Sequence, residues 1–206
     1  FYKEVNILTD SISPLSGAKI GFAMCGSFCT FAPVFAELER LTKEFDDVVP
    51  ILSEVSASVD SRFGTAKEHR EKIAALCGRK PLLTIAEAEP IGPKALLDLL
   101  IIAPCTGNTL GKMACGITDS VVTMAAKAQL RNHRPVLIAV STNDGLGASG
   151  KNILELMGRR NLYFVPFGQD DPMGKPQSLK ADMSRITEAA KAALEGRQLQ
   201  PVLLGQ

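Results

Sequence analysis

Five short apolar runs recur along the chain and alternate with segments of helical periodicity. The runs cover residues 20–24, 48–52, 99–103, 136–140 and 162–165. A strand that is buried on both faces reads as a continuous apolar run, whereas a half-exposed strand alternates. Strands of this kind separated by helices predict a parallel α/β sheet.

The helical segments carry apolar residues at spacings of three and four. They cover residues 31–45, 66–77, 118–129 and 179–195. Thr30 stands where it can cap the first helix, and Gly78 follows the second at a usual stop position. We expect an ordered loop at residues 166–176. Residues 1–16 are interpreted as an arm or an expression scar, and residues 17–206 as one domain.

The composition of the chain limits the classes of partner that it can bind. The 206 residues are 46% hydrophobic and 22% charged, with a formal net charge of +1. Acidic and basic residues are scattered, which gives no electrostatic footprint for nucleic acid or an anionic membrane. The sequence shows neither an apolar run of about 18 residues nor a basic start followed by an apolar core. We therefore expect a cytoplasmic protein whose partners are small molecules or other proteins.

The most informative motif follows the third apolar run, where residues 103–112 read Ala-Pro-Cys-Thr-Gly-Asn-Thr-Leu-Gly-Lys. The strand stops here in a Pro, a Gly and hydrogen-bonding side chains that begin a helix. Free backbone N–H groups at a helix start can hold an anion. Asn108 and Thr109 can bond to a ligand, and Lys112, one turn into the helix, can point its charge back at them. Asp119 is placed to pair with Lys112.

Three further strand ends carry candidate binding residues, because the carboxyl ends of parallel strands meet at one edge of an open sheet. The last of them, residues 167–175, can contribute Gln169 or an Asp. In the first loop, Gly26 allows close backbone approach, and Ser27 and Thr30 offer hydroxyls beside a helix start. This arrangement suits a phosphate as well as an ordinary helix cap. After the fourth run, Asn143 can read the edge of a heterocycle, and Asp144 can act as a base or orient one. Asn-Asp-Gly is equally a common turn.

The remaining reactive residue types favour structural roles. The five cysteines are odd in number and include no Cys-x-x-Cys pair, so we expect neither disulfides nor a metal site. Cys105 is expected to line a pocket, and His69 to be a structural histidine on an apolar helix face. The side chains of Asp170 and Asp171 would diverge in an extended chain, which favours a turn over an acid and base pair.

Several motifs in a fixed order make the chain resemble a known family. They are Ile-Gly-Phe-Ala-x-x-Gly-Ser from residue 20, Ala-Pro-x-Thr-Gly-Asn-Thr-x-x-Lys from 103, Gly-Ile-Thr-Asp from 116, Met-Ala-Ala-Lys from 124, Leu-Arg-Asn-x-Arg-Pro from 130, Ser-Thr-Asn-Asp from 141 and Tyr-Phe-Val-Pro-Phe-Gly-Gln-Asp-Asp-Pro from 163. Over about residues 17–204 this order closely resembles the dipicolinate synthase B subunits. That family lies within the flavoprotein superfamily of flavin-dependent cysteine decarboxylases and flavin prenyltransferases.

The resemblance implies a three-layer, Rossmann-like parallel sheet with helices on both faces. It also implies a role in making dipicolinate, the spore calcium chelator, in the mother cell of a sporulating bacterium. The family's B subunit works with an A subunit that resembles an NADP- or NAD-dependent dehydrogenase. The implied reaction takes a hydride and a proton from a dihydro or hydroxytetrahydro pyridine dicarboxylate. Superfamily members are commonly homo-oligomers, and the resemblance implies one here.

The superfamily pattern also implies which residues bind FMN. Its Pro-Ala-Ser-Ala-Asn-Thr motif cups the flavin ring, and this chain matches it at Pro104, Asn108 and Thr109. Thr106 and Gly107 depart from the pattern, and of the second motif, Pro-x-Met-Asn, only Asn143 is retained. Where the decarboxylases have a catalytic His, residues 89–92 read Glu-Pro-Ile-Gly.

Three functions stay open at this point. The leading hypothesis is an oxidoreductase subunit that completes its site with a partner, with Lys112 and Asp144 as catalytic residues. Its expected cofactor-binding residues are Gly26, Ser27, Thr30, Pro104, Thr106, Asn108, Thr109 and Asn143. The second is an autonomous FMN-dependent decarboxylase or prenyltransferase, against which the missing His argues. The third is a non-catalytic subunit that stabilises its partner.

Overall fold

Strands and helices alternate through residues 17–205, which a computed structural model describes. The strands are β1 Lys19–Met24, β2 Asp47–Leu52, β3 Leu99–Cys105, β4 Val136–Thr142, β5 Leu162–Phe164, β6 Phe167–Asp171 and β7 Lys175–Ala181. The α-helices are α1 Phe31–Glu44, α2 Glu54–Ser58, α3 Ala66–Cys77, α4 Ile85–Ala88, α5 Gly107–Ala114, α6 Val121–Arg131, α7 Gly150–Met157 and α8 Ile186–Leu194. Short 3-10 turns are η2 Phe28–Thr30, η3 Glu89–Ile91 and η4 Met183–Arg185. The interpretation of residues 1–16 lies outside the described residues.

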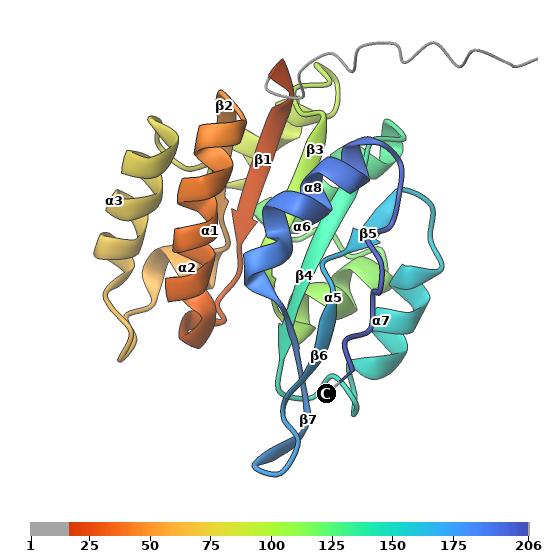
Figure 1. Cartoon of the computed structure of the whole chain (residues 1–206). Helices are drawn as coiled ribbons and strands as arrows, with labels where there is room; N and C mark the ends of the chain where they lie inside the picture. The colour runs from red at the N-terminus through yellow and green to blue at the C-terminus, as the bar shows by residue number, and fades with distance from the viewer. Residues whose placement is uncertain (1–16, 206) are drawn as a thin grey trace, which may run out of the picture.

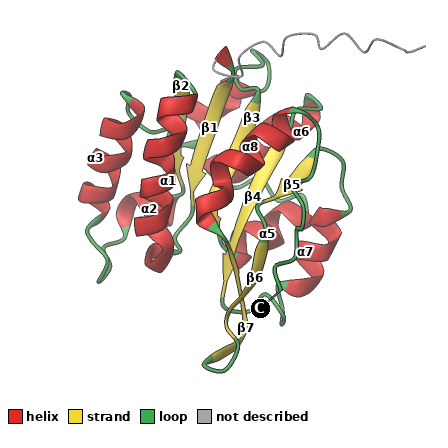
Figure 2. Ribbon diagram, viewed as in Figure 1, coloured by secondary structure: helices red, strands yellow, loops and turns green. Residues whose placement is uncertain are grey.

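Within the described residues, seven strands form one sheet with the order β2-β1-β3-β4-β7-β6, and β5 also pairs with β4. β1 to β5 run parallel, and β7 joins the end of β4 antiparallel, opposite Ser141 and Thr142. Helices α1 and α8 cover one face of the sheet, and α5 and α6 lie behind it (Figures 1 and 2). The expected three-layer parallel architecture is confirmed.

The centre of the core is β3, whose seven residues are all buried. Leu100, Ile101 and Ile102 have no exposed surface, and burying each such side chain contributes about 1.5–3 kcal/mol relative to leaving it in water. All five strands predicted from apolar runs are present. The helix predicted at residues 66–77 has those bounds, and Gly78 ends it in the left-handed conformation at φ 65°.

The prediction for residues 166–195 is wrong in its first half. The expected loop and the start of the expected helix form a β-hairpin, β6–β7, and helix α8 begins only at Ile186. Leu179 and Ala181 are buried on the sheet while Lys180 between them is exposed, which is the alternation of a half-buried strand. The side chain of Asp171 accepts from the Gly174 N–H at 2.8 Å, so the predicted turn role of Asp171 is confirmed.

The expected cap at Thr30 is also wrong. Its hydroxyl donates to the Ser27 carbonyl at 2.7 Å and makes no cap hydrogen bond to α1. Helix α1 continues directly from η2, so the Phe31 N–H is already paired with the Phe28 carbonyl. None of the helices in residues 17–205 is both long and apolar enough to cross a membrane.

Candidate functional site

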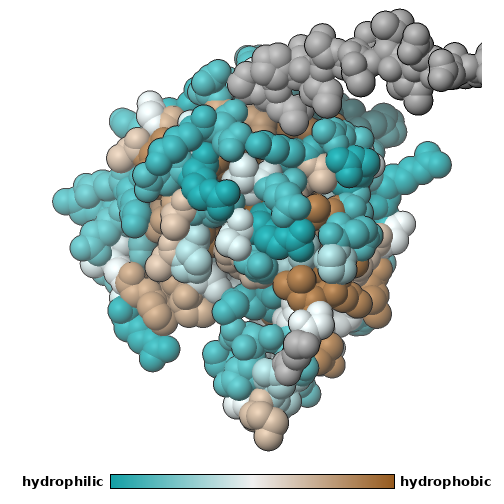
Figure 3. Space-filling model, in the orientation of Figure 1, coloured by the Kyte–Doolittle hydropathy of each residue, from teal (hydrophilic) through white to brown (hydrophobic). Residues whose placement is uncertain are grey.

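A cleft of about 1230 Å³ lies at the carboxyl edge of the parallel strands. Its walls are the loops that follow β1, β3 and β4, the segment between α2 and α3, and the β6–β7 hairpin. The strand order reverses direction between β1 and β3, and open α/β sheets bind ligands outside such a switch point. Figure 3 shows a notch beside the hairpin, which projects beyond the rest of the molecule. The expected gathering of strand-end loops is therefore present.

A hydrogen bond between two serines ties the first and third of these loops together. The hydroxyls of Ser27 and Ser141 are 2.9 Å apart, although 114 residues separate them in sequence. Gly26 has a packing role that the sequence did not predict. A Cβ there would lie 2.6 Å from Cγ1 of Val55 in α2, so the missing side chain lets α2 close on the loop. Gly26, Ser27 and Thr30 all line the cleft.

The loop after β3 presents the start of α5 to the cleft. Thr106 caps this helix by accepting from the Thr109 N–H at 3.4 Å. Thr106, Gly107 and Asn108 line the cleft, and Asn108 is exposed there. Because the amino end of a helix carries partial positive charge, this corner favours a negatively charged or carbonyl-bearing ligand atom.

Asp144 is bonded within the protein. The hydroxyl of Thr142 donates to its carboxylate, and with Ser149 it holds the pKa of Asp144 below the ordinary value. Gly107 packs against the same group, since a Cβ on it would lie 3.0 Å from Asp144 Oδ1. A carboxylate whose pKa is lowered by hydrogen bonds is ionised at neutral pH and is a weak general base. The geometry therefore favours orientation of α5 over proton removal.

Three predicted site residues do not line the cleft. Pro104 is buried in β3, and Thr109 is buried with its hydroxyl donating to Cys25 Sγ at 3.2 Å. Lys112 binds Asp119 at 2.8 Å, which confirms that predicted pair. The expectation that Lys112 points back at Asn108 is wrong, because its ammonium is held by the loop that follows α5.

The buried thiols lie beneath the cleft and not in it. Cys105, expected to line a pocket, is fully buried in β3 and is absent from the cleft wall. Burial, together with the neighbouring Cys25, raises the pKa of the Cys105 thiol well above its ordinary value. His69 is buried as expected, and its Nε2 lies 3.4 Å from the carbonyl of Phe63.

Sequence reasoning missed one wall of the cleft and the cationic side chains of another. The missed wall is the segment between α2 and α3, where the guanidinium carbon of Arg62 lies 4.8 Å from the ring centroid of Phe63. Phe63 is 47% exposed, and an aromatic side chain left open beside an arginine suits a planar ligand. The fourth strand-end loop, residues 167–175, reaches this edge as expected and contributes Asp170, but the hairpin that it forms also contributes Lys175 and Lys180. The adjacent Arg62 and Phe63 could have been noticed in the sequence as a candidate binding pair. The two lysines could not, because their position at the cleft depends on the hairpin.

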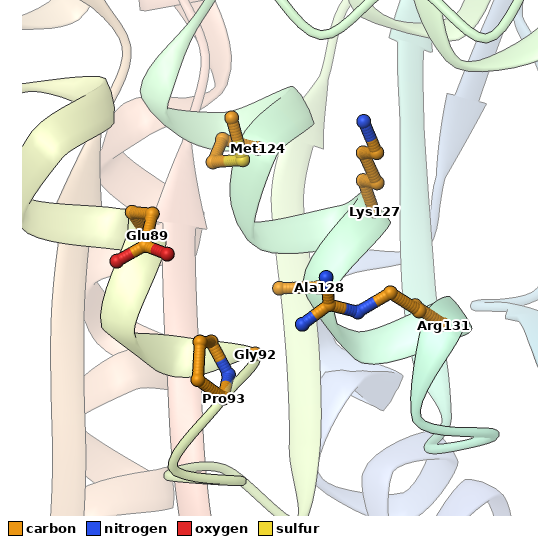
Figure 4. A pocket seen from close by; sticks show the side chains of 7 residues that line it. All are labelled: Glu89, Gly92, Pro93, Met124, Lys127, Ala128 and Arg131. Carbon is orange, nitrogen blue, oxygen red and sulfur yellow. The ribbon is translucent and has the colours of Figure 1, made fainter.

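A second hollow, of about 210 Å³, shares no residue with the cleft. It lies between η3 and α6, and Figure 4 shows Arg131 extending from α6 toward Gly92 and Pro93, while the Lys127 side chain runs along the rim. Glu89 lies on its other side. Its small volume makes the strand-end cleft the better candidate for a cofactor or substrate.

The strand-end cleft has the chemistry that a flavin needs. Amide side chains at Asn108 and Asn143 can pair with a heterocycle edge, and the Ser27 hydroxyl and the start of α5 can donate to oxygens. Phe63 offers an aromatic face on the same cleft. The donor set and the volume together fit the group.

Comparison with known proteins agrees with this geometry. A family model described as Flavoprotein matches residues 10–180. The chain belongs to the Flavoprotein family. Among Flavoprotein relatives, the B subunit of dipicolinate synthase from Bacillus subtilis (strain 168) is 46% identical over 193 residues, covering 94% of this chain and 96% of the relative.

Solved structures extend the comparison to three dimensions. The crystal structure of the dipicolinate synthase B subunit from Bacillus halodurans C has a TM-score of 0.85 and 43% identity, and covers 94% of this chain and all of that chain, 100%. The FMN-dependent cysteine decarboxylase SpaF has a TM-score of 0.61 and 24% identity, with 87% and 98% covered, and shows the shared fold alone. The resemblance seen in the sequence motifs is confirmed, and the chain groups with the dipicolinate synthase B subunits of the Flavoprotein family.

Proposed function

We propose that this chain is the B subunit of a dipicolinate synthase. It acts with an A subunit to oxidise dihydrodipicolinate, or its hydroxytetrahydro precursor, to dipicolinate during sporulation. The observation that carries the proposal is the 46% identity to a dipicolinate synthase B subunit across 94% of the chain. The cleft supports it, because its amide, hydroxyl and cationic side chains suit a planar, anionic heterocycle.

The chemistry asks the protein mainly to position its reactants. Dihydrodipicolinate loses a hydride from one ring carbon and a proton from a neighbouring atom, and the ring becomes aromatic. The hydroxytetrahydro form must first lose water. Aromatisation supplies driving force, so orientation of donor and acceptor is the main contribution expected of the site. The hydride acceptor is a nicotinamide, NADP or NAD, on the partner, or a flavin in this cleft.

We propose FMN as the cofactor of this cleft. A bound flavin would accept a hydride there. Ser27, Asn108 and Asn143 would hold it, and Gly26 and Thr30 would shape the loop on which Ser27 stands. Thr106 would fix the start of α5 by capping it. Asp144 would act as a positioning residue, since its bonded carboxylate orients Gly107 and thereby Asn108.

Activity of the reconstituted enzyme tests the proposal. The chain is mixed with the dehydrogenase-like A subunit, and dipicolinate is measured as it forms. Wild type should produce it, and Asn108→Ala should slow it about tenfold, as expected for the loss of one or two hydrogen bonds to a ligand. Asn152→Ala, a change of the same kind in α7 and outside the cleft wall, should keep wild-type activity.

Absence of dipicolinate from the wild-type pair would contradict the proposed function. Full activity in Asn108→Ala would be compatible with the proposed function but would contradict a role for the cleft in it. The homo-oligomer that the resemblance implies stays a prediction, which light scattering on the purified chain checks.

A further inference from the structure

The β6–β7 hairpin carries two lysines that the proposed function has not used. It extends past the carboxyl edge of the parallel strands (Figures 1 and 2), and Lys175 and Lys180 line the cleft. In the strand register, Lys180 lies directly opposite Ser141 of β4. Ser141 is the residue bonded to Ser27, so the lysine stands beside the junction of two binding loops.

Asp170 holds both ammonium groups. Its Oδ1 lies 2.5 Å from Lys180 Nζ, and its Oδ2 lies 3.2 Å from Lys175 Nζ. The Asp170 side chain is only 20% exposed, and the two lysines hold the pKa of its carboxyl below the ordinary value. On the cleft wall these three groups sum to a net charge of +1, and Asp171, which lies opposite Lys175 in the hairpin register but does not line the cleft, partly offsets Lys175 from outside.

The base of the hairpin is tied to the strand ends. The Ser178 hydroxyl donates to the Thr142 carbonyl at 3.3 Å, and the Leu146 N–H donates to the Gln177 carbonyl at 3.0 Å. The ammonium groups are therefore attached to the same frame that carries the binding loops. Charged groups held in place before binding cost less ordering entropy when a ligand arrives.

A further cation, Arg62, lines the cleft from the segment between α2 and α3, which Figure 1 shows apart from the hairpin. Arg62 stacks on Phe63 and makes no ion pair with any residue in 17–205. The ionised carboxylate of Asp144 also lines the cleft, so the charged side chains of the wall, Arg62, Lys175, Lys180, Asp144 and Asp170, together carry a net charge of +1. Cationic side chains thus face the cleft from two places within a wall of net positive charge, which suits a ligand with two separate anionic groups.

We propose that Lys175 and Lys180, held by Asp170, bind one carboxylate of a dicarboxylate ligand, and that Arg62 binds the other. The inference rests on the proposed function, which supplies the pyridine dicarboxylate. The same ammonium groups would also attract a flavin phosphate. The Ser27 loop and the start of α5 already offer N–H and hydroxyl donors for a phosphate, so we assign the lysines to the substrate.

Binding of two related probes to the full chain tests the assignment. Dipicolinate carries two carboxylates and pyridine-2-carboxylate carries one, and their dissociation constants are measured by calorimetry at fixed salt. Lys180→Met should weaken dipicolinate about tenfold or more, the loss expected for a charge-assisted hydrogen bond, and Lys175→Met should act in the same direction. The preference for dipicolinate over the single acid should shrink in both variants.

Lys127→Met is the matched control, because Lys127 lies in the other hollow (Figure 4) and its loss changes the net charge equally. It should leave both dissociation constants unchanged. Equal dipicolinate binding by wild type and both hairpin variants would overturn the assignment. If the hairpin variants bind FMN more weakly and dipicolinate equally well, the lysines bind the flavin phosphate, and the assignment to the substrate is overturned.

The two levels of the proposal fail differently. If the wild-type pair makes dipicolinate and the hairpin variants do so with an unchanged KM, only the hairpin site is wrong. If the wild-type pair makes none and wild type binds neither acid, the proposed function is wrong and the assignment falls with it. The expected result is a raised KM in Lys180→Met with kcat nearly unchanged.

Discussion

Gly107 links the stability of the chain to the shape of its cleft. An alanine Cβ at this position would lie 2.5 Å from Ser149 Oγ and 2.8 Å from Thr142 Oγ1, with Asp144 Oδ1 at 3.0 Å. These are short side chains that hydrogen-bond one another, so they cannot move aside without breaking their contacts. Overpacking of this kind costs about 1–3 kcal/mol. Gly107→Ala should lower the free energy of unfolding by that amount and weaken ligand binding.

Gly111→Ala is the matched control because it makes the same change one turn later in α5. Its Cβ would meet only Asn152 Nδ2, at 3.4 Å, which is an ordinary contact. Alanine is favoured over glycine inside a helix by about 0.5–1 kcal/mol, so this variant should be as stable as wild type or more stable.

Urea unfolding followed by far-UV circular dichroism measures both variants, since the chain has no Trp. Gly107→Ala should lower the unfolding midpoint and Gly111→Ala should leave it unchanged or raise it, with similar m-values. A midpoint for Gly107→Ala at or above that of wild type would refute the packing argument. It would mean that the Thr142 and Asp144 contacts move without cost.

Further predictions follow from single groups. Because hydrogen bonds lower the pKa of Asp144, its contribution to stability is present above about pH 4 and is lost as the pH falls through the lowered pKa. Asp144→Asn should therefore flatten the loss of stability between pH 7 and pH 3 in urea unfolding, and an unchanged slope would contradict this. In a thiol titration with DTNB at pH 8, the exposed Cys29 and Cys115 should react fast. Burial raises the pKa of Cys77 to about 12, so it should react slowly, and fast reaction of a third thiol would count against the structure. Lys112→Met should change stability by about 1 kcal/mol or less, as for an exposed ion pair, and should keep the activity of the reconstituted enzyme. Lost activity at unchanged stability would restore the catalytic role first expected for Lys112.

Most of the parallel sheet is predictable from sequence because burial on both faces leaves continuous apolar runs. The apolar runs of β1 to β5 are visible in the sequence for this reason. Helix α3 is visible for another reason, because its apolar residues have helical spacing and Gly78 ends it. The hairpin was not predictable by the same reasoning. Its strands carry mostly polar residues, with a Gly in β6 and a Pro in β7, and β7 is stabilised by pairing with β6 and the end of β4. Pairing between distant residues leaves little local pattern.

The candidate site was predictable to a similar extent. Ser27, Asn108 and Asn143 line the cleft as expected, because loops after parallel strands meet at one edge of the sheet. The direction of the Lys112 side chain was predicted wrongly. From its position on α5 it could point toward Asn108 or toward Asp119, and in the structure it pairs with Asp119. Lys180 could not be found, since its place beside Ser141 depends on the register of a strand that the sequence did not reveal.

The visible absorption spectrum of the purified chain, after incubation with FMN and removal of unbound dye, tests the cleft most directly. We predict that wild type retains flavin absorbance and that Asn108→Ala retains less. A colourless wild-type protein would contradict the flavin site. The hydride would then pass to the nicotinamide of the partner subunit, and this chain would bind substrate alone.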